Sequence, residues 1–189
     1  MERSRTEVLI IGGSAGSLHI ILDMLNDLKD DLKFPIVIVV HRKAQSESLL
    51  PKLFQLHTNK KVLELEDKMT IYSNEIYVVP SDYHALFESK NMMSLDASEK
   101  INYSRPSIDV TFRSAAEIFK KNAVAILLSG ANSDGVEGLA HIAKQKGKIW
   151  IQNPQTADVD YMPKYAMEHV QYNCIFEPSN LALKINNLL

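Results

Sequence analysis

The sequence has 189 residues, of which 46% are hydrophobic, and its 21 basic and 23 acidic residues leave a formal net charge of −2. This length and composition are typical of one domain with a sizeable core, and the near-neutral balance disfavours a nucleic-acid partner. The short polar start MERSRTE and the single cysteine, Cys174, provide no signal-peptide core, membrane span or internal disulfide, so we expect one cytoplasmic domain over 1–189.

Short runs rich in Val and Ile recur along the chain and are continuous rather than alternating, which is typical of strands covered on both faces. They lie at 7–11, 36–40, 76–79, 123–128 and 148–152. Apolar residues at helical spacing predict helices between them, over 18–25, 112–119 and 136–143. This alternation predicts an α/β fold, with a doubly wound, mostly parallel sheet and helices on both faces.

Smaller signals refine this outline. Ser107 is expected to cap the helix that contains 112–119, and Ser179 is expected to cap a C-terminal helix. Between 60 and 100 the segment TIYSNEIYVV has a polar pair, Ser73-Asn74, between two β-prone pieces. This pattern predicts a hairpin of short antiparallel edge strands.

Three reactive side chains follow predicted strands. Ser14 follows the first strand, His41 the second, and Asp134 lies in the loop SGANSDG after the strand at 123–128. Because the carboxyl ends of parallel strands converge on one crevice, we expect these side chains to share a rim. A hydroxyl, an imidazole and a carboxylate are the set that performs acyl transfer. GGSAG also fits G-x-S-x-G, and the helix after Ser14 would direct backbone N–H groups at a developing oxyanion.

Each of these residues also has a structural alternative. Ser14 could cap a helix, His41 could be a hydrogen-bonded core histidine, and Asp134 could be an N-cap. His84 follows the strand at 76–79 and competes with His41 as a base. Three carboxylates near predicted strand ends compete with Asp134, namely Asp82, Asp158 and Asp160. Only the joint placement of all three groups at strand ends favours catalysis.

A first strand that runs into glycines and a helix also begins a dinucleotide site. Gly13 and Gly16 supply two glycines of G-x-G-x-x-G, but Ile11 stands in the place of the first. The second strand ends in His41-Arg42-Lys43 where an NAD site has an acid, although a basic pair could accept the 2′-phosphate of NADP. The hypothesis of an NADP site is therefore less favoured by the sequence, but it stays open.

Five blocks, in chain order, carry a resemblance: IIGGSAGS, IVIVVH, VVPSDYH, RPSIDVTFRSAA and LSGANSDGVEGL. With the later QNPQTADVDYMPKYA, they resemble the catalytic domain of the chemotaxis protein-glutamate methylesterase family, CheB. The resemblance runs from residue 7 to the C-terminal helix, so it covers nearly the whole chain.

The resemblance implies a parallel α/β domain in which Ser14 is the nucleophile, His41 the general base and acid, and Asp134 the residue that orients His41. It further implies that the backbone N–H groups of Ala15 and Ala131 are oxyanion donors. The family hydrolyses γ-methyl esters of glutamate on the cytoplasmic helices of methyl-accepting chemoreceptors, some members deamidate glutamine, and neither a metal nor a cofactor is needed. The partners implied are chemoreceptors and a separate response-regulator protein.

The sequence departs from the family pattern at several places. The family usually has G-M-G-x-D-G where this chain has Gly130-Ala131-Asn132-Ser133-Asp134-Gly135. Ser17 stands where a second glycine is common, Arg42 follows the histidine, and we expect no N-terminal receiver domain over 1–189. Two alternatives therefore stay open. One is an esterase or amidase with a substrate other than a chemoreceptor, and the other is a non-catalytic module that binds an anion or NADP or docks a signalling protein.

Overall fold

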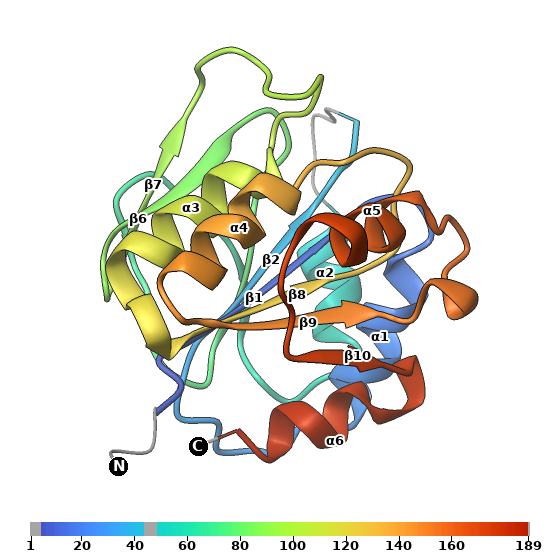
Figure 1. The fold of residues 1–189 in the computed structure, drawn as a ribbon. Helices are drawn as coiled ribbons and strands as arrows, with labels where there is room; N and C mark the ends of the chain where they lie inside the picture. Colours follow the sequence, from blue (N-terminus) through green and yellow to red (C-terminus); the bar gives the residue numbers. More distant parts are fainter. Residues whose placement is uncertain (1–4, 44–48, 189) are drawn as a thin grey trace.

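The computed structural model describes residues 5–43 and 49–188, and its centre is a seven-stranded sheet in the order β10-β9-β8-β1-β2-β5-β3 (Figure 1). Every neighbouring pair in this sheet is parallel. The doubly wound parallel fold predicted from the sequence is therefore confirmed. The strands are β1 (Val8–Gly13), β2 (Ile36–Val40), β3 (Val62–Glu64), β5 (Ile76–Val78), β8 (Ala123–Leu127), β9 (Lys148–Gln152) and β10 (Cys174–Phe176).

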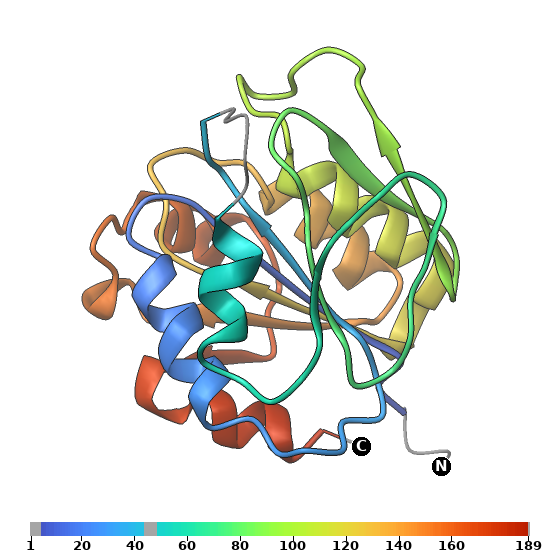
Figure 2. The same cartoon turned by 180° about the vertical axis from the view of Figure 1, so that it is seen from behind.

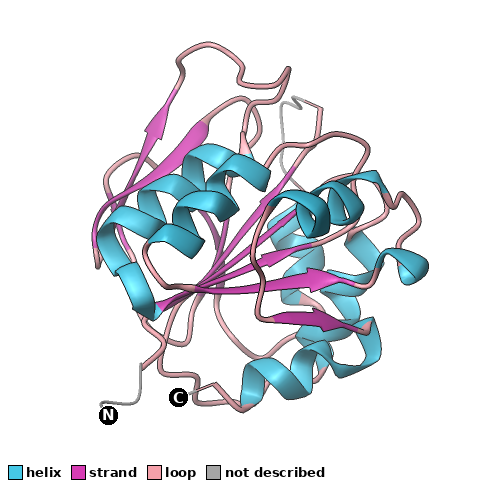
Figure 3. Cartoon of the chain, in the orientation of Figure 1, coloured by secondary structure: helices cyan, strands magenta, loops and turns pink. Residues whose placement is uncertain are grey.

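Helices cover both faces of the sheet, as expected (Figures 2 and 3). Successive side chains of β1 point to opposite faces, so Val8 and Ile10 pack with α3, α4 and α5, whereas Leu9 and Ile11 pack with α1, α2 and α6. The helices are α1 (Leu18–Asn26), α2 (Leu50–Gln55), α3 (Ile108–Phe119), α4 (Val136–Lys144), α5 (Tyr161–His169) and α6 (Leu181–Asn186). Within the described ranges, no helix has the length and apolar character needed to cross a membrane.

The strand order reverses beside β1. The chain proceeds from β1 to β2 and β5 on one side, and later from β8 to β9 and β10 on the other. This topological switch point is where open α/β sheets form their ligand crevice, just beyond the carboxyl ends of the strands. Ser14 follows the last residue of β1 and therefore lies at that crevice.

The antiparallel strands differ from the prediction. Ser73-Asn74 does not turn a hairpin, because β4 (Met69–Thr70) and β5 belong to different sheets. The antiparallel hairpin is formed instead by β6 (His84–Ser89) and β7 (Met92–Asp96), and β4 joins them in a separate three-stranded sheet. This sheet packs on α3, with the Phe87 ring at 86° and 5.0 Å from Phe119. The two edges of the large sheet, β3 and β10, are parallel strands.

The two predicted helix caps have different outcomes, since Ser107 occupies the N-cap position of α3 as expected, whereas Ser179 does not cap α6. Ser107 precedes the first residue of α3, but its hydroxyl makes no capping bond and donates to Asp134 instead. Ser179 lies inside a 3₁₀ turn, Pro178–Asn180, and α6 begins only after Asn180. Short polar side chains mark both helix starts, but long-range partners decide where their hydroxyl groups point.

Candidate active site

Ser14 sits in a tight turn between β1 and α1. Its carbonyl accepts hydrogen bonds from the Ser17 N–H at 3.2 Å and the Ser17 hydroxyl at 2.7 Å. The left-handed conformation that this turn requires falls on Gly16, at φ +79°, where glycine has no Cβ to clash. The helix begins at Leu18, as the apolar spacing over 18–25 predicted, so Ser14 lies one turn before α1 with a half-buried side chain.

His41 is held beside Ser14 by the sheet itself. Its backbone N–H donates to the Gly13 carbonyl at 3.1 Å, which continues the β1–β2 pairing by one residue. Its ring then lies between the two other candidates, with Nδ1 at 3.1 Å from Ser14 Oγ and Nε2 at 2.6 Å from Asp134 Oδ2. The structure thus brings together three residues that lie 27 and 93 positions apart in the chain.

Asp134 is fully buried and its carboxylate accepts four hydrogen bonds. Besides His41, the donors are the Ser107 hydroxyl at 2.9 Å and the backbone N–H groups of Ile108 at 2.7 Å and Asp109 at 3.1 Å. These N–H groups belong to the first turn of α3, which has no intrahelical acceptor for them and favours an anion. Asp134 is therefore an anchored carboxylate on the N-terminus of α3, and not the cap of α4.

The electrostatics of Asp134 follow from these contacts. Burial alone would raise the pKa of Asp134, but the hydrogen bonds from His41 and from the α3 backbone outweigh it and hold the pKa below its ordinary value. An ionised carboxylate can only accept, so His41 Nε2 carries the proton of that bond and Nδ1 is left as an acceptor for the Ser14 hydroxyl. The tautomer is suited to removing a proton from Ser14.

The two ring nitrogens are exchanged relative to the serine-protease triad, in which the carboxylate binds Nδ1 and the serine binds Nε2. Either nitrogen of a neutral imidazole can accept a proton when the other donates to a carboxylate. The chemistry of proton transfer is therefore retained, and only the direction from which the ring reaches the serine is changed.

The rival residues are placed elsewhere. His84 is buried, accepts from the Ser107 N–H through Nδ1 at 3.1 Å and donates from Nε2 to the Glu99 carbonyl at 2.8 Å, so both nitrogens have structural partners. The three rival carboxylates each face a surface cation or histidine: Asp82 pairs with Arg105, Asp160 with Lys164, and Asp158 lies 3.8 Å from His19.

The peptides of Ala15 and Ala131 flank Ser14. The Ser14 carbonyl is bound by Ser17, and the Gly130 carbonyl accepts from the Met162 N–H at 3.0 Å. In a trans peptide the next N–H points opposite to the carbonyl, so the Ala15 and Ala131 N–H groups are directed away from α1 and α5. Gly130 approaches Ser14 closely, because a Cβ at Gly130 would lie 3.0 Å from the Ser14 Cβ and 2.5 Å from Met162.

The loop that departs from the family pattern has its own fixed shape. The Asn132 side-chain oxygen accepts from the Asp134 N–H at 3.0 Å, a local turn that needs no glycine at position 132. Asn132, Ser107 and the first turn of α3 all help to position Asp134, and the sequence analysis did not predict this role for any of them. The expected helix start at Ser107 was a usable signal, since helix N-termini attract carboxylates.

A second buried acid, Asp109, lies beside Asp134. It accepts from the Gly138 N–H at 2.7 Å and from the Asn102 amide at 3.1 Å. Burial and the neighbouring Asp134 charge raise the pKa of Asp109 to about 7, against the opposing hydrogen bond from Gly138. Within the part of the chain that the structure describes, the Asp109 carboxyl forms no hydrogen bond with His41 or Ser14, and it supports the site through Gly138 and Asn102.

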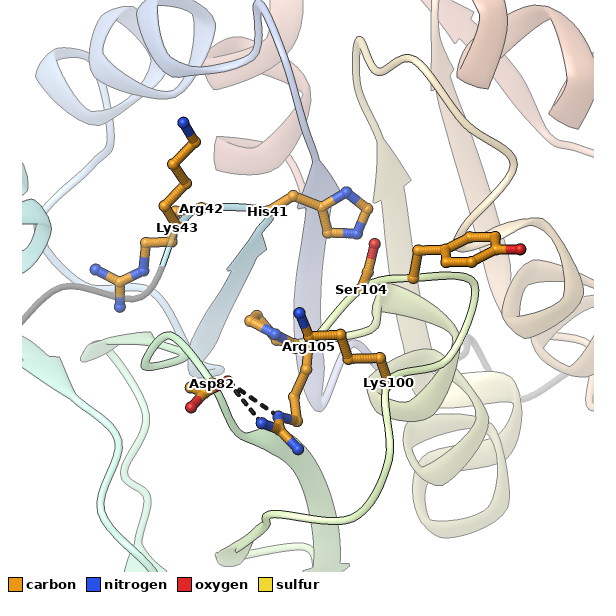
Figure 4. A pocket seen from close by; sticks show the side chains of 9 residues that line it. His41, Arg42, Lys43, Asp82, Lys100, Ser104 and Arg105 are labelled. Atoms are coloured by element: carbon orange, nitrogen blue, oxygen red, sulfur yellow. Dashed lines mark hydrogen bonds and ion pairs between the residues drawn. The ribbon is translucent and has the colours of Figure 1, made fainter.

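Two hollows meet at His41 and Arg42. The apolar hollow has a volume of about 300 Å³ and is lined by Ser14, Ser17, Leu18, Val40, His41, Arg42, Leu49, Leu50 and Leu53. The cationic hollow, of about 450 Å³, is shown in Figure 4 and is lined by His41, Arg42, Lys43, Asp82, Lys100, Tyr103, Ser104, Arg105 and Pro106. A substrate that reaches Ser14 therefore passes between an apolar and a positively charged surface.

The site offers little to a nucleotide or a metal ion. Two N–H groups of the 13–17 turn are already used, since Ser14 N–H donates to the Ser129 carbonyl at 2.8 Å and Ser17 N–H to Ser14. These two N–H groups are therefore not available to a phosphate, which further disfavours the NADP alternative. Among the residues that the structure describes, no group of three or more His, Cys, Asp or Glu side chains could hold a metal ion.

Residues 9–185 match the family model described as CheB methylesterase. A Leptospira interrogans protein assigned as a protein-glutamate methylesterase/protein-glutamine glutaminase is 36% identical over 176 residues, which cover 93% of this chain and 91% of that protein. The Thermotoga maritima protein-glutamate methylesterase/protein-glutamine glutaminase is 29% identical over 86% of this chain, which spans only 48% of that longer relative.

The fold agrees with this relationship. The crystal structure of the Thermotoga maritima CheB methylesterase catalytic domain matches with a TM-score of 0.92 at 26% identity, over 97% of this chain and 99% of that one. The family match covers both sides of the crevice, including the segments that carry Ser14, His41 and Asp134. The chain belongs to the CheB methylesterase family.

Proposed function

We propose that this protein hydrolyses γ-methyl esters of glutamate residues with Ser14 as nucleophile, His41 as general base and acid, and Asp134 as the residue that orients His41. The observation that carries the proposal is the continuous hydrogen-bonded chain from Ser14 Oγ through both ring nitrogens of His41 to the buried Asp134 carboxylate. Names of family members, which combine methylesterase and glutaminase activity, support the same reaction class.

In the first half-reaction, Ser14 Oγ attacks the ester carbonyl while its proton moves to His41 Nδ1. The imidazolium that forms is stabilised by Asp134, which stays ionised. The Ala15 and Ala131 N–H groups are directed away from α1 and α5, and we assign them to the oxyanion of the tetrahedral intermediate. When the intermediate collapses, the methoxy oxygen takes the proton from His41 Nδ1 and leaves as methanol.

The second half-reaction releases the acyl group from Ser14. His41 Nδ1 accepts a proton from water, the resulting hydroxide attacks the acyl carbon, and the proton returns to Ser14 Oγ as glutamate is released. A glutamine side chain would pass through the same acyl intermediate, with ammonia as the leaving group in place of methanol. The same residues therefore also support a glutaminase activity.

We place this reaction on the cytoplasmic helices of methyl-accepting chemoreceptors, with a separate response regulator as a further partner. The support is the family match, together with the two hollows of about 300 and 450 Å³ beside the reactive residues, which leave room for a polypeptide around the ester. An esterase with another substrate would share the chemistry, so the choice between the two depends on substrate preference. A methylated receptor fragment should be a better substrate than small methyl esters.

The decisive experiment is methanol release from a methylated receptor fragment by the wild type and by Ser14→Ala. Loss of the nucleophile should lower kcat by about 10⁴-fold or more, with an unchanged fold by circular dichroism. Ser179→Ala is a matched control, because Ser179 is exposed in a 3₁₀ turn of another surface. Methanol release by Ser14→Ala at the wild-type rate would refute the assignment.

A further inference from the structure

The cationic hollow adjoins the reactive residues but takes no part in the chemistry proposed above. Four of its lining residues are cations, Arg42, Lys43, Lys100 and Arg105, against a single carboxylate, Asp82. The formal net charge of the whole chain is −2, so this concentration of positive charge is local. A hollow of one charge sign raises the local concentration of oppositely charged groups.

Two of these cations are engaged within the protein. Arg105 donates to Asp82 at 2.7 and 3.2 Å and to the carbonyls of Ala97 and Ser98 at 3.0 and 2.9 Å. Arg42 donates to Glu64 at 3.1 Å and to the Val79 carbonyl at 2.9 Å. Within the described ranges, the Lys43 and Lys100 ammonium groups form no hydrogen bond or ion pair.

Lys100 is the better placed of these two lysines. Figure 4 shows its side chain pointing to the middle of the hollow, between His41 and the Asp82–Arg105 pair, whereas Lys43 extends away from that centre. Hydrogen bonds hold the loop that carries Lys100 in place. Arg105 donates to the Ser98 carbonyl, and buried His84 donates to the Glu99 carbonyl at 2.8 Å. The Ile101–Ser104 bridge fixes the loop on the other side.

We propose that the cationic hollow binds a side-chain carboxylate of an acidic peptide segment that flanks the reacting residue, with Lys100 as the main determinant. This inference rests on the proposed function, because the substrate is then a polypeptide. On a helical substrate, side chains three or four positions from the ester lie about 5–6 Å away, within reach of a hollow that shares His41 with the reactive site.

The free donors favour a carboxylate over a phosphate. Bidentate phosphate binding uses an arginine fork or a cluster of backbone N–H groups, and the Arg105 fork is already filled by Asp82 and by two carbonyls. A lysine ammonium is a point charge that tolerates varied approach angles, as a flexible glutamate or aspartate side chain requires. The resulting selectivity acts on sequence around the ester and not on the ester itself.

The test compares two peptides that carry the same central γ-methyl glutamate, one flanked by Glu and one by Gln at the positions one helical turn away. For the wild type at low salt, kcat/KM should be about two- to fivefold higher for the Glu-flanked peptide, the range of a partly exposed charge pair. Lys100→Gln should bring the ratio close to one, Lys100→Glu should invert it, and added salt should reduce the wild-type ratio.

Lys144→Glu is the charge-matched control. Lys144 is the exposed last residue of α4, at the end remote from Asp134, and it borders a different hollow. This variant should keep the wild-type ratio. An equal loss of the ratio in Lys100→Glu and Lys144→Glu would show a general charge effect and overturn the proposal, as would a wild-type ratio of one.

Measuring peptide binding without turnover tests this inference independently of the proposed function. Fluorescence anisotropy of the two labelled peptides with Ser14→Ala should show the same preference without turnover. In that background Lys100→Gln should abolish the preference and Lys100→Glu should invert it. If the wild type hydrolysed neither peptide, the proposed function would fail while this preference could still be measured. Displacement of the acidic peptide by an equal concentration of inorganic phosphate would reassign the hollow to free anions and overturn the proposal.

Discussion

The two ends of the hydrogen-bonded chain in the crevice are built differently. At the Asp134 end, the carboxylate is 0% exposed and four donors fix it, three of them from Ser107 and the first turn of α3. At the Ser14 end, the hydroxyl is half-buried and its bond to His41 measures 3.1 Å, against 2.6 Å on the carboxylate side. The anchored end sets the direction of the imidazole, and the open end leaves room for a substrate.

This difference predicts the largest effect for Asp134→Asn. The introduced side-chain amide would donate to His41 Nε2, which would force the proton onto Nδ1 and remove the acceptor that faces Ser14. We expect kcat for ester hydrolysis to fall by about 10⁴-fold with little change in KM. Asp160→Asn, at an exposed carboxylate that pairs with Lys164, should retain wild-type activity. An Asp134→Asn variant with more than a tenth of the wild-type kcat would contradict the anchoring role.

The second prediction is a pH dependence of the unfolding free energy that arises from Asp109, the buried acid beside Asp134. The pKa of Asp109 is raised to about 7 in the folded protein, above its ordinary value of 3.8. Between these values the folded state holds a proton that the unfolded state releases, so stability falls as pH rises toward 7 and changes little above it. We expect the wild type to lose about 2 kcal/mol of unfolding free energy between pH 5 and pH 8 relative to Asp109→Asn.

Urea denaturation of both proteins at several pH values measures this difference. Because the amide introduced by Asp109→Asn does not titrate, the difference between the two curves isolates the Asp109 contribution from that of all other groups. Asp134 acts in the opposite direction, since its lowered pKa stabilises the fold at high pH and loses that effect only in acid. Parallel stability curves for the two proteins would show that Asp109 does not titrate in this range.

The smallest effect is expected for Ser107→Ala, which removes one of the four donors to Asp134. The remaining bonds from His41 and the α3 backbone should keep the carboxylate ionised and in place. We expect a loss of about 1 kcal/mol of stability and a reduction of kcat by only a few-fold. The Ser179→Ala variant provides the comparison for both measurements, and a loss of kcat as large as that of Asp134→Asn would mean that Ser107 alone positions the carboxylate.

The family blocks and the positions at strand ends are sequence signals that predict Ser14, His41 and Asp134 as the reactive residues. The structure places these three side chains in one chain of hydrogen bonds. Local patterns could not choose between His41 and His84, because both follow apolar strands. The difference arises from their neighbours: His84 is enclosed by the Ser107 N–H and the Glu99 carbonyl, which come from two other segments.

The sequence alone determined the α/β fold class with a mostly parallel sheet, the main strands and helices, and the family. Apolar periodicity and short motifs are properties of neighbouring residues, so they can be recognised without the fold. Tertiary structure decided the β6–β7 pairing, the ring nitrogen that faces Ser14, the four donors around Asp134 and the position of Lys100. Each of these depends on groups far apart in the chain that compete for the same hydrogen bonds or charges, and that competition is settled only when the elements pack.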